Sequence, residues 1–416
     1  MRVLYSAAHA GFARELVPLG GGAAVANQLI AEWERTRPFE LEVIDPSILG
    51  SNAPTGRDLV RFGERDYARF CYAFGKAATE AVLSHDPANT AVLVNDISEG
   101  PDFKRIAGRG FRIFTIYHVD VVAYVADIYA RGWVRPETLV RWYDRLSAFM
   151  PQMARLVFEK QLQTVMFSRK IIVPSLRMRS VIESCYGHRA QKKVEVMPWG
   201  TWADEPDELA LAHEVANLRK EFSVPLGTRV LLTLSRISPE KGQDLLLEAL
   251  RDWQPRDPVV LFICGEAAFM QGARYLERLR RLECRNVRVI FPGYVSGLRK
   301  QAFQRLADLY IFPSRHESYG LTLLEALHAG LPAVCLDHHG AREVMRPEFG
   351  RIVSKDGLRA AIEGMLSGDR QAMSSAAAQF ARQQPFSLTA ARLASLITQE
   401  EAHQTPKPDS QTSYIL

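Results

Sequence analysis

Two glutamates eight residues apart, Glu317 and Glu325, are the first candidates for chemistry in this chain. Gly320 lies between them and marks the expected start of a helix, whose apolar side is formed by leucines at helical spacing. The free N–H groups of a first helical turn and the positive end of its dipole favour an anion. The stretch therefore predicts a phosphate site flanked by two carboxylates that could hold sugar hydroxyls.

Two cations, Arg236 and Lys241, form a second candidate set. They follow the apolar run 229–235 in a loop from strand to helix, at the strand end where open α/β sheets bind ligands. Two fixed cations suit the two phosphates of a nucleoside diphosphate, and they would stabilise the charge that grows as it departs. The alternative is an ordinary surface loop.

Short apolar runs separated by helical patterns must position these residues. This alternation indicates parallel sheets with helices on both faces, and 416 residues suffice for two such domains. We expect an α/β protein with two Rossmann-like, doubly wound parallel-sheet domains that face each other across a cleft. Strands are expected at 2–6, 39–45, 89–96, 111–118, 170–174, 193–197, 229–235, 259–264, 287–291, 308–312, 333–336 and 351–353.

The first domain carries two weaker signals. Gly21 and Gly22 end a glycine-rich turn between a strand and a helix, where bare amides can bind phosphate. The turn has neither the GxGxxG spacing of a dinucleotide fold nor the GKS or GKT of a P-loop. His118 is expected to close its strand at the carboxyl end, the edge where ligands bind, although a lone histidine is more often structural than catalytic.

The whole string from Pro313 to Pro332, placed between two strands, resembles the signature of retaining glycosyltransferases of the GT-B fold, specifically the GT4-like group (glycosyl transferases group 1). The Arg236 to Gly242 loop and the turn 340–344 also resemble that family. The resemblance implies an acceptor-binding domain over 1–200, a nucleotide-sugar-binding domain over 201–385, and a helix over 386–401 that crosses back to the first domain. The tail 402–416 is expected to be disordered.

The resemblance also implies a role for each matching residue. Glu325 would bind the ribose hydroxyls, Glu317 would orient the donor sugar, and His118 would lie against that sugar from the first domain. The expected catalytic set is Glu317, His118, Arg236 and Lys241. The expected donor-binding set is Glu325, Gly21, Gly22, Tyr319, Gly320, Leu321, Thr322 and Gly265, the last in a segment that matches the family's Gly-x-Gly-Pro only in part.

The implied reaction moves a hexose from a nucleoside diphosphate sugar, with UDP-glucose as the default donor, to a hydroxyl of a glycan, lipid or small molecule with retention of configuration. No second acid is placed as a nucleophile on the opposite face, so attack on the face of the departing diphosphate is expected. The sequence has no Asp-x-Asp motif, and we expect no metal and no cofactor. The alternatives are a sugar phosphorylase, a nucleotide-sugar epimerase or a non-catalytic GT-B binding subunit.

Composition bounds the remaining choices. No apolar run approaches the ~20 residues that span a bilayer, and five scattered cysteines without a CxxC pair indicate a reduced, cytoplasmic protein. The net charge of +5 lies within residues 1–200, which hold 26 basic and 21 acidic residues, and it is too small for nucleic-acid binding. Such a bias fits an anionic acceptor or peripheral contact with the inner membrane face, and equally a plain solvated surface.

Three further features of the chain bear on the acceptor side. One long helix is expected over 57–83. On it Arg57, Arg61, Arg65 and Arg69 repeat at helical spacing among acidic residues. They would form either a solvated face of ion pairs or a contact with the acceptor or a membrane. Trp199 stands where the resembled family has Asn at the crossing between domains. Residues 123–167 would shape the acceptor site, with a packed core and a carbohydrate platform both open for Tyr124, Tyr129, Trp133, Trp142, Tyr143 and Phe149.

Overall fold

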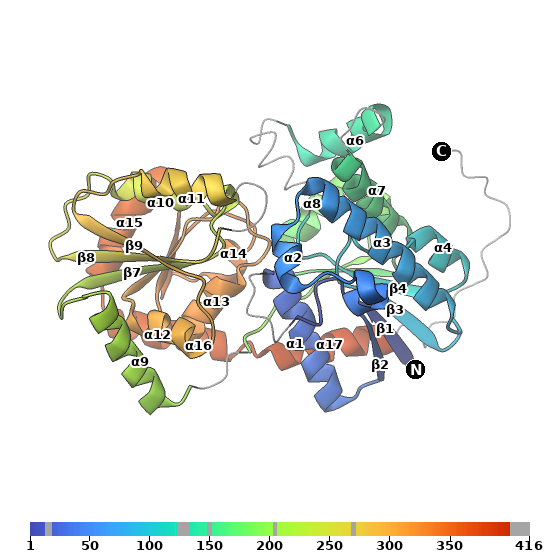
Figure 1. Cartoon of the computed structure of the whole chain (residues 1–416), viewed down its shortest axis with the longest axis horizontal. Coiled ribbons are helices and arrows are strands. Elements are labelled where there is room, and N and C mark those ends of the chain that lie inside the picture. The colour runs from blue at the N-terminus through green and yellow to red at the C-terminus, as the bar shows by residue number, and fades with distance from the viewer. Residues whose placement is uncertain are drawn as a thin grey trace.

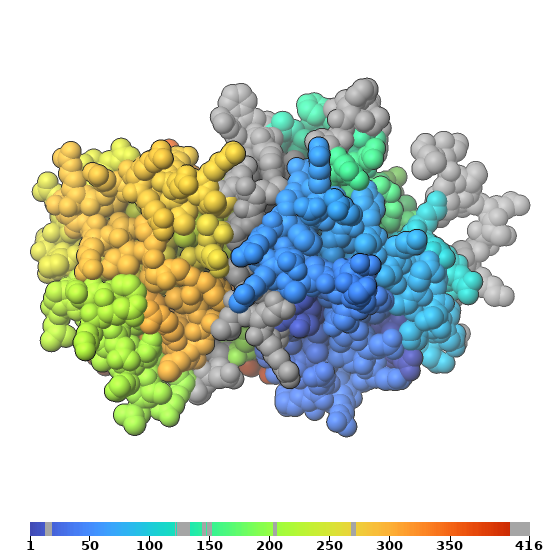
Figure 2. Space-filling view, in the orientation of Figure 1, coloured from blue at the N-terminus to red at the C-terminus, as the bar shows by residue number. Residues whose placement is uncertain are grey.

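The computed structural model describes residues 1–12, 19–120, 122, 134–147, 152–202, 206–267 and 272–399. These residues form two α/β domains, each built on a six-stranded sheet (Figure 1). Figure 2 shows the domains as two lobes, with the blue and cyan residues of the first beside the green to orange residues of the second. The expected class of two doubly wound parallel-sheet domains is confirmed.

The first sheet has the strand order β2-β1-β3-β4-β5-β6, and its described neighbours all pair in parallel. Its central strand β3 is buried along its whole length because helices cover both faces. The elements of this domain are β1 (Arg2–Ser6), α1 (Gly21–Thr36), β2 (Glu40–Ile44), η1 (Pro46–Asn52), α2 (Gly56–Arg61), α3 (Glu64–Leu83), β3 (Thr90–Val94), α4 (Phe103–Gly108), β4 (Arg112–Ile116), α6 (Pro136–Leu146), α7 (Gln152–Phe167), β5 (Lys170–Val173), α8 (Leu176–Tyr186), η4 (Gly187–Arg189) and β6 (Val194–Val196).

The second sheet has the order β12-β11-β10-β7-β8-β9 and is likewise parallel. Every residue of β8 is buried, as its unbroken apolar sequence predicts. The elements are α9 (Glu208–Glu221), β7 (Arg229–Leu234), η5 (Pro239–Lys241), α10 (Gln243–Leu250), β8 (Val259–Cys264), α11 (Gly272–Arg280), β9 (Val287–Gly293), α12 (Gly297–Leu306), β10 (Leu309–Phe312), α13 (Leu321–His328), β11 (Ala333–Leu336), α14 (Ala341–Val344), β12 (Gly350–Val353), η6 (Lys355–Gly357), α15 (Leu358–Leu366), α16 (Arg370–Arg382) and α17 (Phe386–Gln399).

The chain passes between the domains at two places that are hydrogen-bonded to each other. Thr201 N–H donates to Gln384 O at 2.8 Å, and Phe386 N–H donates back to Thr201 O at 2.8 Å. Gly200 allows this close approach, because a Cβ there would lie 2.4 Å from Phe386 N. After the second crossing, α17 lies under the first domain beside α1 (Figure 1), where Trp33 Nε1 donates to Ala390 O at 3.1 Å.

Two sequence expectations are wrong in detail. The helix expected over 57–83 is two helices, because Gly63 has an extended conformation (φ −75°, ψ 172°) and α3 begins after it. The regular arginine repeat is therefore split between α2 and α3, and of the described contacts an ion pair joins Arg69 to Asp66 at 3.3 Å. The second error concerns β4, which ends at Ile116, so His118 lies in the following loop.

Among the described residues, every helix is too short or too polar to span a bilayer.

Candidate active site

The candidate site is assembled from loops at the carboxyl ends of strands in both domains. In the second domain these loops follow β7, β10 and β11. These strands lie side by side in the sheet, although β7 and β10 are not consecutive in the chain. In the first domain the corresponding loops follow β1, β3 and β4, also neighbours. Parallel strands place all their carboxyl ends at one edge of the sheet, which is where open α/β sheets bind ligands.

Lys241 and Glu317 form the central ion pair of the second domain. Lys241 Nζ donates to Glu317 Oε1 at 2.6 Å, and both side chains are largely buried, with 12% and 21% of their surface exposed. Burial alone would raise the pKa of Glu317, but the Lys241 charge holds this pKa below its ordinary value. The carboxylate is therefore ionised at neutral pH and available as a hydrogen-bond acceptor.

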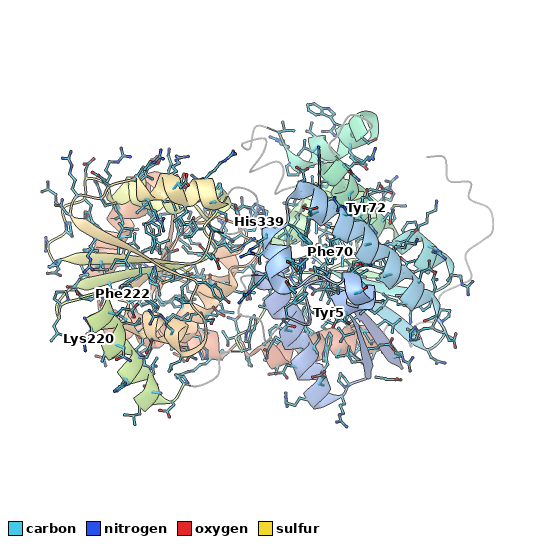
Figure 3. The ribbon with its side chains drawn as sticks, viewed as in Figure 1. Tyr5, Phe70, Tyr72, Lys220, Phe222 and His339 are labelled. Atoms are coloured by element: carbon cyan, nitrogen blue, oxygen red, sulfur yellow. The ribbon has the colours of Figure 1, made fainter. Side chains whose placement is uncertain are left out.

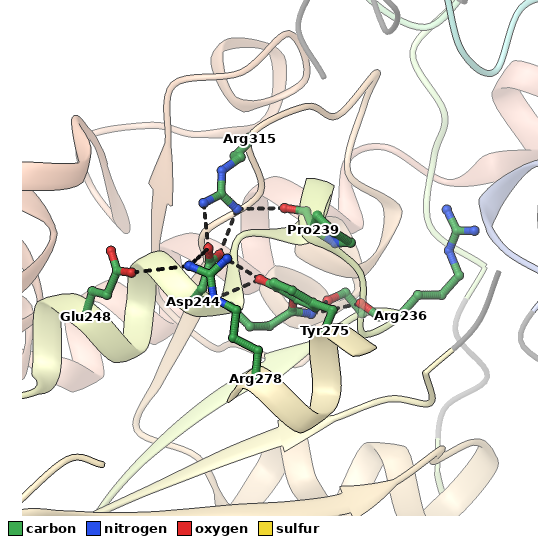
Figure 4. Close-up of polar contacts among 9 residues, drawn as sticks. Arg236, Pro239, Asp244, Glu248, Tyr275, Arg278 and Arg315 are labelled. Carbon is green, nitrogen blue, oxygen red and sulfur yellow. Dashed lines mark hydrogen bonds and ion pairs between the residues drawn. The ribbon is translucent and has the colours of Figure 1, made fainter. Parts of the chain in front are cut away.

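The loop that carries Lys241 is braced from the loop after β10 by Arg315 (Figure 4). Arg315 donates to both carboxylate oxygens of Asp244, at 2.7 and 2.9 Å, and to Pro239 O at 2.6 Å. Tyr275 OH adds a bond of 2.6 Å to the same carboxylate. The Asp244 carboxylate is buried, and a bidentate arginine–carboxylate pair fixes geometry well, so the two loops are held in a fixed position relative to each other.

Arg236 extends away from this braced cluster (Figure 4). Its guanidinium lies 3.8 Å from Glu240 Oε1. Its charge also acts on His9 of the first domain, whose pKa it lowers. Arg236 thus faces the space between the domains, as expected of a residue that contacts a ligand held there.

The N-terminus of α13 lies against the first domain. Gly320 precedes the helix in a left-handed conformation (φ 96°) that suits glycine. Leu321 reaches Gly21, on which a Cβ would lie 3.1 Å from Leu321 Cδ1. The side chains of Thr322 and Tyr319 have protein partners: Thr322 Oγ1 accepts from Tyr310 OH at 3.0 Å, and Tyr319 OH donates to Trp199 O at 2.6 Å.

Glu325 is paired with a residue that the sequence did not suggest. Lys300 Nζ on α12 donates to Glu325 Oε1 at 3.0 Å. The carboxylate, together with Gly200 and Thr201 of the interdomain crossing, lines a small cavity between the domains. Because a carboxylate has about four acceptor positions, Lys300 fixes its orientation and leaves acceptor capacity for a ligand.

His118 is half-buried in the first domain, beside Gly22 and the crossing. Its Nε2 lies 2.9 Å from Asn95 Oδ1, and its ring centroid lies 5.8 Å from that of Trp199. Burial lowers the pKa of His118 to about 4, so the imidazole is neutral above that pH. Trp199, whose replacement of Asn the sequence left unexplained, is buried and also stacks on Phe386 of α17 at 6.3 Å.

A second titratable cluster in the first domain was missed by the sequence analysis. His9 Nδ1 lies 3.1 Å from Asp96 Oδ1, and His9 stacks on Tyr67, whose hydroxyl donates to Glu99. Burial would lower the pKa of His9, but the Asp96 carboxylate raises it to about 9. Asp96 follows β3 by two residues, so the strand-end rule that selected His118 could have found it.

Gly265 is required by the backbone, and its predicted contact with the donor stays a prediction. A Cβ there would lie 1.8 Å from Ser235 O, so glycine is required for the backbone after β8 to pass beside the backbone that leads to Arg236. Its structural role is to place that loop. The described residues contain no group of three or more His, Cys, Asp or Glu side chains that could hold a metal ion.

The aromatic stretch is described only in part. Tyr124, Tyr129, Trp133 and Phe149 lie outside the described residues. Trp142 on α6 is exposed, and Tyr143 stacks on Phe158 of α7 with ring centroids 5.3 Å apart. The tail expected to be disordered, 402–416, also lies outside the described residues.

Comparison with known proteins finds relatives of part of the chain. Residues 214–382 match the family model described as Glycosyl transferases group 1. Over 182 residues the chain is 35% identical to a GDP-mannose-dependent alpha-(1-6)-phosphatidylinositol monomannoside mannosyltransferase of Mycobacterium tuberculosis, covering 40% of this chain and 44% of that one. Over 166 residues it is 30% identical to the alpha-monoglucosyldiacylglycerol synthase of Streptococcus pneumoniae, covering 39% and 36%. The chain thus matches less than half the length of these relatives.

Solved structures resemble the whole chain in fold. The sucrose-phosphate synthase of Thermosynechococcus elongatus superposes with a TM-score of 0.70 at 18% identity, covering 97% of this chain and 99% of the other. The Anabaena protein HepE, solved in complex with UDP and glucose, gives a TM-score of 0.62 at 18% identity and covers 96% and 100%. At this identity the likeness establishes the two-domain fold.

Proposed function

We propose that this chain, in which residues 214–382 form a glycosyl transferases group 1 domain within a GT-B fold, transfers a hexose from a nucleoside diphosphate sugar to an acceptor hydroxyl with retention of configuration. One observation carries the proposal: the buried Lys241–Glu317 pair lies beside Arg236 at the strand ends of the second domain, opposite His118 and the Gly21–Gly22 turn of the first. An idle binding module has no physical need for this arrangement of buried charge.

In this proposal the donor binds the second domain through complementary groups. Glu325 accepts from the ribose hydroxyls while Lys300 holds it in place. The Lys241 ammonium has three donors, one of which Glu317 uses, so two remain for diphosphate oxygens. Arg236 supplies the second cation, and the N-terminus of α13 adds the field of its dipole.

The transfer itself requires one bond to form and one to break at the anomeric carbon. The acceptor oxygen attacks from the face that the diphosphate leaves, the bond from that carbon to the diphosphate oxygen breaks, and the departing diphosphate takes the acceptor's proton. Lys241 and Arg236 stabilise the charge that grows on the diphosphate. Glu317 orients the sugar, and neutral His118 approaches it from the first domain.

Experiment can identify the base of the donor nucleotide and the acceptor directly. UDP-glucose remains our prediction for the donor, and GDP-mannose is the second candidate because a relative 35% identical over 182 residues is named for it. The names of the two curated relatives described above each contain a lipid, so a lipid hydroxyl is the first acceptor class to test, ahead of glycans and small molecules. Cytoplasmic location and contact with the inner membrane face remain predictions.

The test is thermal unfolding of the purified protein with UDP, GDP, ADP and dTDP at equal concentration. A ligand present at ~100 times its Kd adds ~2.7 kcal/mol to stability, which raises Tm by several degrees. We expect one nucleotide to stabilise the wild type and to stabilise a Lys241→Ala variant much less, with Lys76→Ala, an exposed lysine on α3, as the matched control.

Turnover then separates the remaining candidates. Transfer of labelled hexose from the matching nucleotide sugar to a lipid extract supports the proposal. Release of sugar phosphate in inorganic phosphate without any nucleotide would identify a phosphorylase, and interconversion of two nucleotide sugars without an acceptor would identify an epimerase. Absence of any nucleotide-dependent shift in Tm would contradict the proposed donor class and favour a non-catalytic binding subunit.

A further inference from the structure

His338 is a buried histidine that the site described above does not yet use. It follows β11 by two residues, at the same sheet edge as the loop that carries Glu317, and only 2% of its surface is exposed. Its Nδ1 accepts the N–H of Ala341 at 3.1 Å. A neutral imidazole that accepts at Nδ1 carries its proton at Nε2, so Nε2 is a donor.

No protein group among the described residues accepts the Nε2 proton of His338. The ring is fixed by Phe312, which meets it edge to face at 5.2 Å, as well as by the bond at Nδ1. Burial lowers the pKa of His338 to about 4, so the ring does not gain a proton at neutral pH. A buried donor that is left unpaired is unfavourable, and a ligand that supplies an acceptor removes this penalty.

The position of His338 relative to Glu317 is fixed by the backbone. Gly340 N–H donates to Glu317 O at 3.1 Å, and a Cβ on Gly340 would lie 1.9 Å from Tyr319 O. The two loops are thus in direct contact, and the charges of Glu317 and Lys241 both act on His338. A fixed donor therefore stands beside a fixed acceptor, with the cation that would hold the diphosphate close by.

The loop 337–343 also contacts the first domain, so domain opening uncovers it. Glu343 Oε1 accepts the N–H of Leu176 at the start of α8 at 2.7 Å, and Arg177 donates to Asp337 Oδ1 at 3.4 Å. Figure 3 places the neighbouring His339 at the boundary between the domains. Separation of the domains breaks these two contacts and gives a ligand access to the loop.

We propose that His338 and Glu317 together recognise one hydroxyl group of the transferred sugar: His338 Nε2–H donates to the hydroxyl oxygen, and that hydroxyl donates its own proton to the Glu317 carboxylate. This inference rests on the proposed function. Only a group that both donates and accepts satisfies the pair. A deoxy sugar removes both hydrogen bonds, and a fluoro sugar, which cannot donate, removes the one to Glu317. Charge recognition of the diphosphate falls to Lys241 and Arg236, because the imidazole is neutral.

The test is calorimetric binding of UDP-glucose against UDP, and of GDP-mannose against GDP, to the wild type and three variants. His338→Asn keeps an acceptor near the Ala341 N–H but has no group at the Nε2 position. His338→Gln places an amide N–H near the Nε2 position. His338→Phe keeps the ring and removes both nitrogens.

We expect the sugar to bind about tenfold more weakly to His338→Asn and His338→Phe, with part of the loss restored in His338→Gln and nucleotide affinity unchanged. Deoxy sugar nucleotides locate the hydroxyl: its removal at one position lowers wild-type affinity, and lowers the affinity of His338→Asn less, because the variant keeps only the bond to Glu317. An Asn variant with wild-type sugar affinity overturns the assignment, as does an equal loss for sugar nucleotide and bare nucleotide, which indicates a structural role. Wild-type protein that binds none of UDP, GDP, ADP and dTDP overturns the proposed function itself.

Discussion

Gly22 and His118 are in contact across the carboxyl edge of the first sheet: a Cβ on Gly22 would lie 3.1 Å from Cδ2 of His118 and 3.3 Å from its Cγ. Glycine at this position therefore sets where the imidazole can lie, independently of any contact that Gly22 itself makes with a ligand.

Replacement of Gly22 by Val should displace His118 and lower turnover by about tenfold or more, because misplacement of a reacting group by ~1 Å is costly. Nucleotide affinity should be unchanged, since the nucleotide is held by the second domain. Gly108→Ala is the control, because a Cβ there meets nothing within 4 Å. Equal losses of kcat in both variants would contradict this role for Gly22.

Replacement of Lys241 by Ala should reduce kcat by ~100-fold or more, through loss of charge stabilisation on the departing diphosphate. It also leaves the Glu317 carboxylate without its cation, so the pKa of Glu317 should rise and the activity of the variant should fall at low pH where the wild type remains active. A pH–rate profile of both proteins measures this. Arg236→Ala should lower kcat similarly, and a double variant with wild-type kcat would remove both residues from the mechanism.

Replacement of Glu325 by Ala should weaken nucleotide binding by more than the replacement of its partner, Lys300→Ala. The carboxylate is the group proposed to contact the ribose, whereas Lys300 holds it in position at 3.0 Å. We expect about tenfold and a few-fold increases in nucleotide Kd respectively, in line with the ~1 kcal/mol of a hydrogen bond. Titration calorimetry with the stabilising nucleotide decides the order; the reverse order would assign the direct contact to Lys300.

His9 predicts a pH dependence of stability. Its pKa in the folded protein is about 9, above the ~6.5 of the unfolded chain. The group therefore contributes stability that is fully present below pH 6.5 and is lost as the pH rises through 9. Chemical denaturation between pH 6 and 10 should show a decline in wild-type stability across this window that His9→Gln lacks. Parallel curves for the two proteins would show that the Asp96 contact does not raise this pKa.

The dependence of the transferase activity on a metal ion can be measured directly. We expect transferase activity to be unchanged after treatment with EDTA and gel filtration, since Lys241 and Arg236 supply the positive charge that a divalent ion supplies elsewhere. Activity that is abolished by EDTA and restored by Mg²⁺ or Mn²⁺ would contradict this expectation.

Sequence patterns predicted the strands well because the strands of a doubly wound sheet are buried on both faces. β1, β8 and β11 begin and end at the expected residues. β8 and β11 are short unbroken apolar runs bounded by Pro, Gly or a polar residue, and β1 is an apolar run with Arg2 and Ser6 at its two ends. The resemblance to the glycosyl transferases group 1 family is likewise confirmed, because its motif is local and continuous in sequence. The break between α2 and α3 was not predicted, because the helical spacing of side chains continues across Gly63.

The pairs that hold the site together could not be predicted in this way. Glu317 and Lys241 are 76 residues apart, and Arg315 and Asp244 are 71 apart. Glu317 and Lys241 were selected in the sequence analysis, whereas Asp244 lies in the first turn of α10. Which cation meets which carboxylate depends on side-chain packing between these segments. Lys300 lies on the side of helix α12, and no sequence rule predicts that a residue at such a position belongs to the site. His338 follows a strand that was correctly predicted, so the strand-end rule could have selected it.

The paired crossings at Thr201 and Gln384 make the link between the domains a single hinge. Two separate connections would permit one domain to slide along the other. Two chain segments that are hydrogen-bonded side by side leave rotation of one domain about a single axis as the main motion. Points near that axis move little, and Glu325 shares a cavity with Gly200 and Thr201. If the domains rotate about this axis, the proposed ribose contact of Glu325 would persist as they open. The segment 337–343 contacts the first domain, so the proposed recognition of the sugar would be coupled to closure, and the nucleotide would be able to bind first.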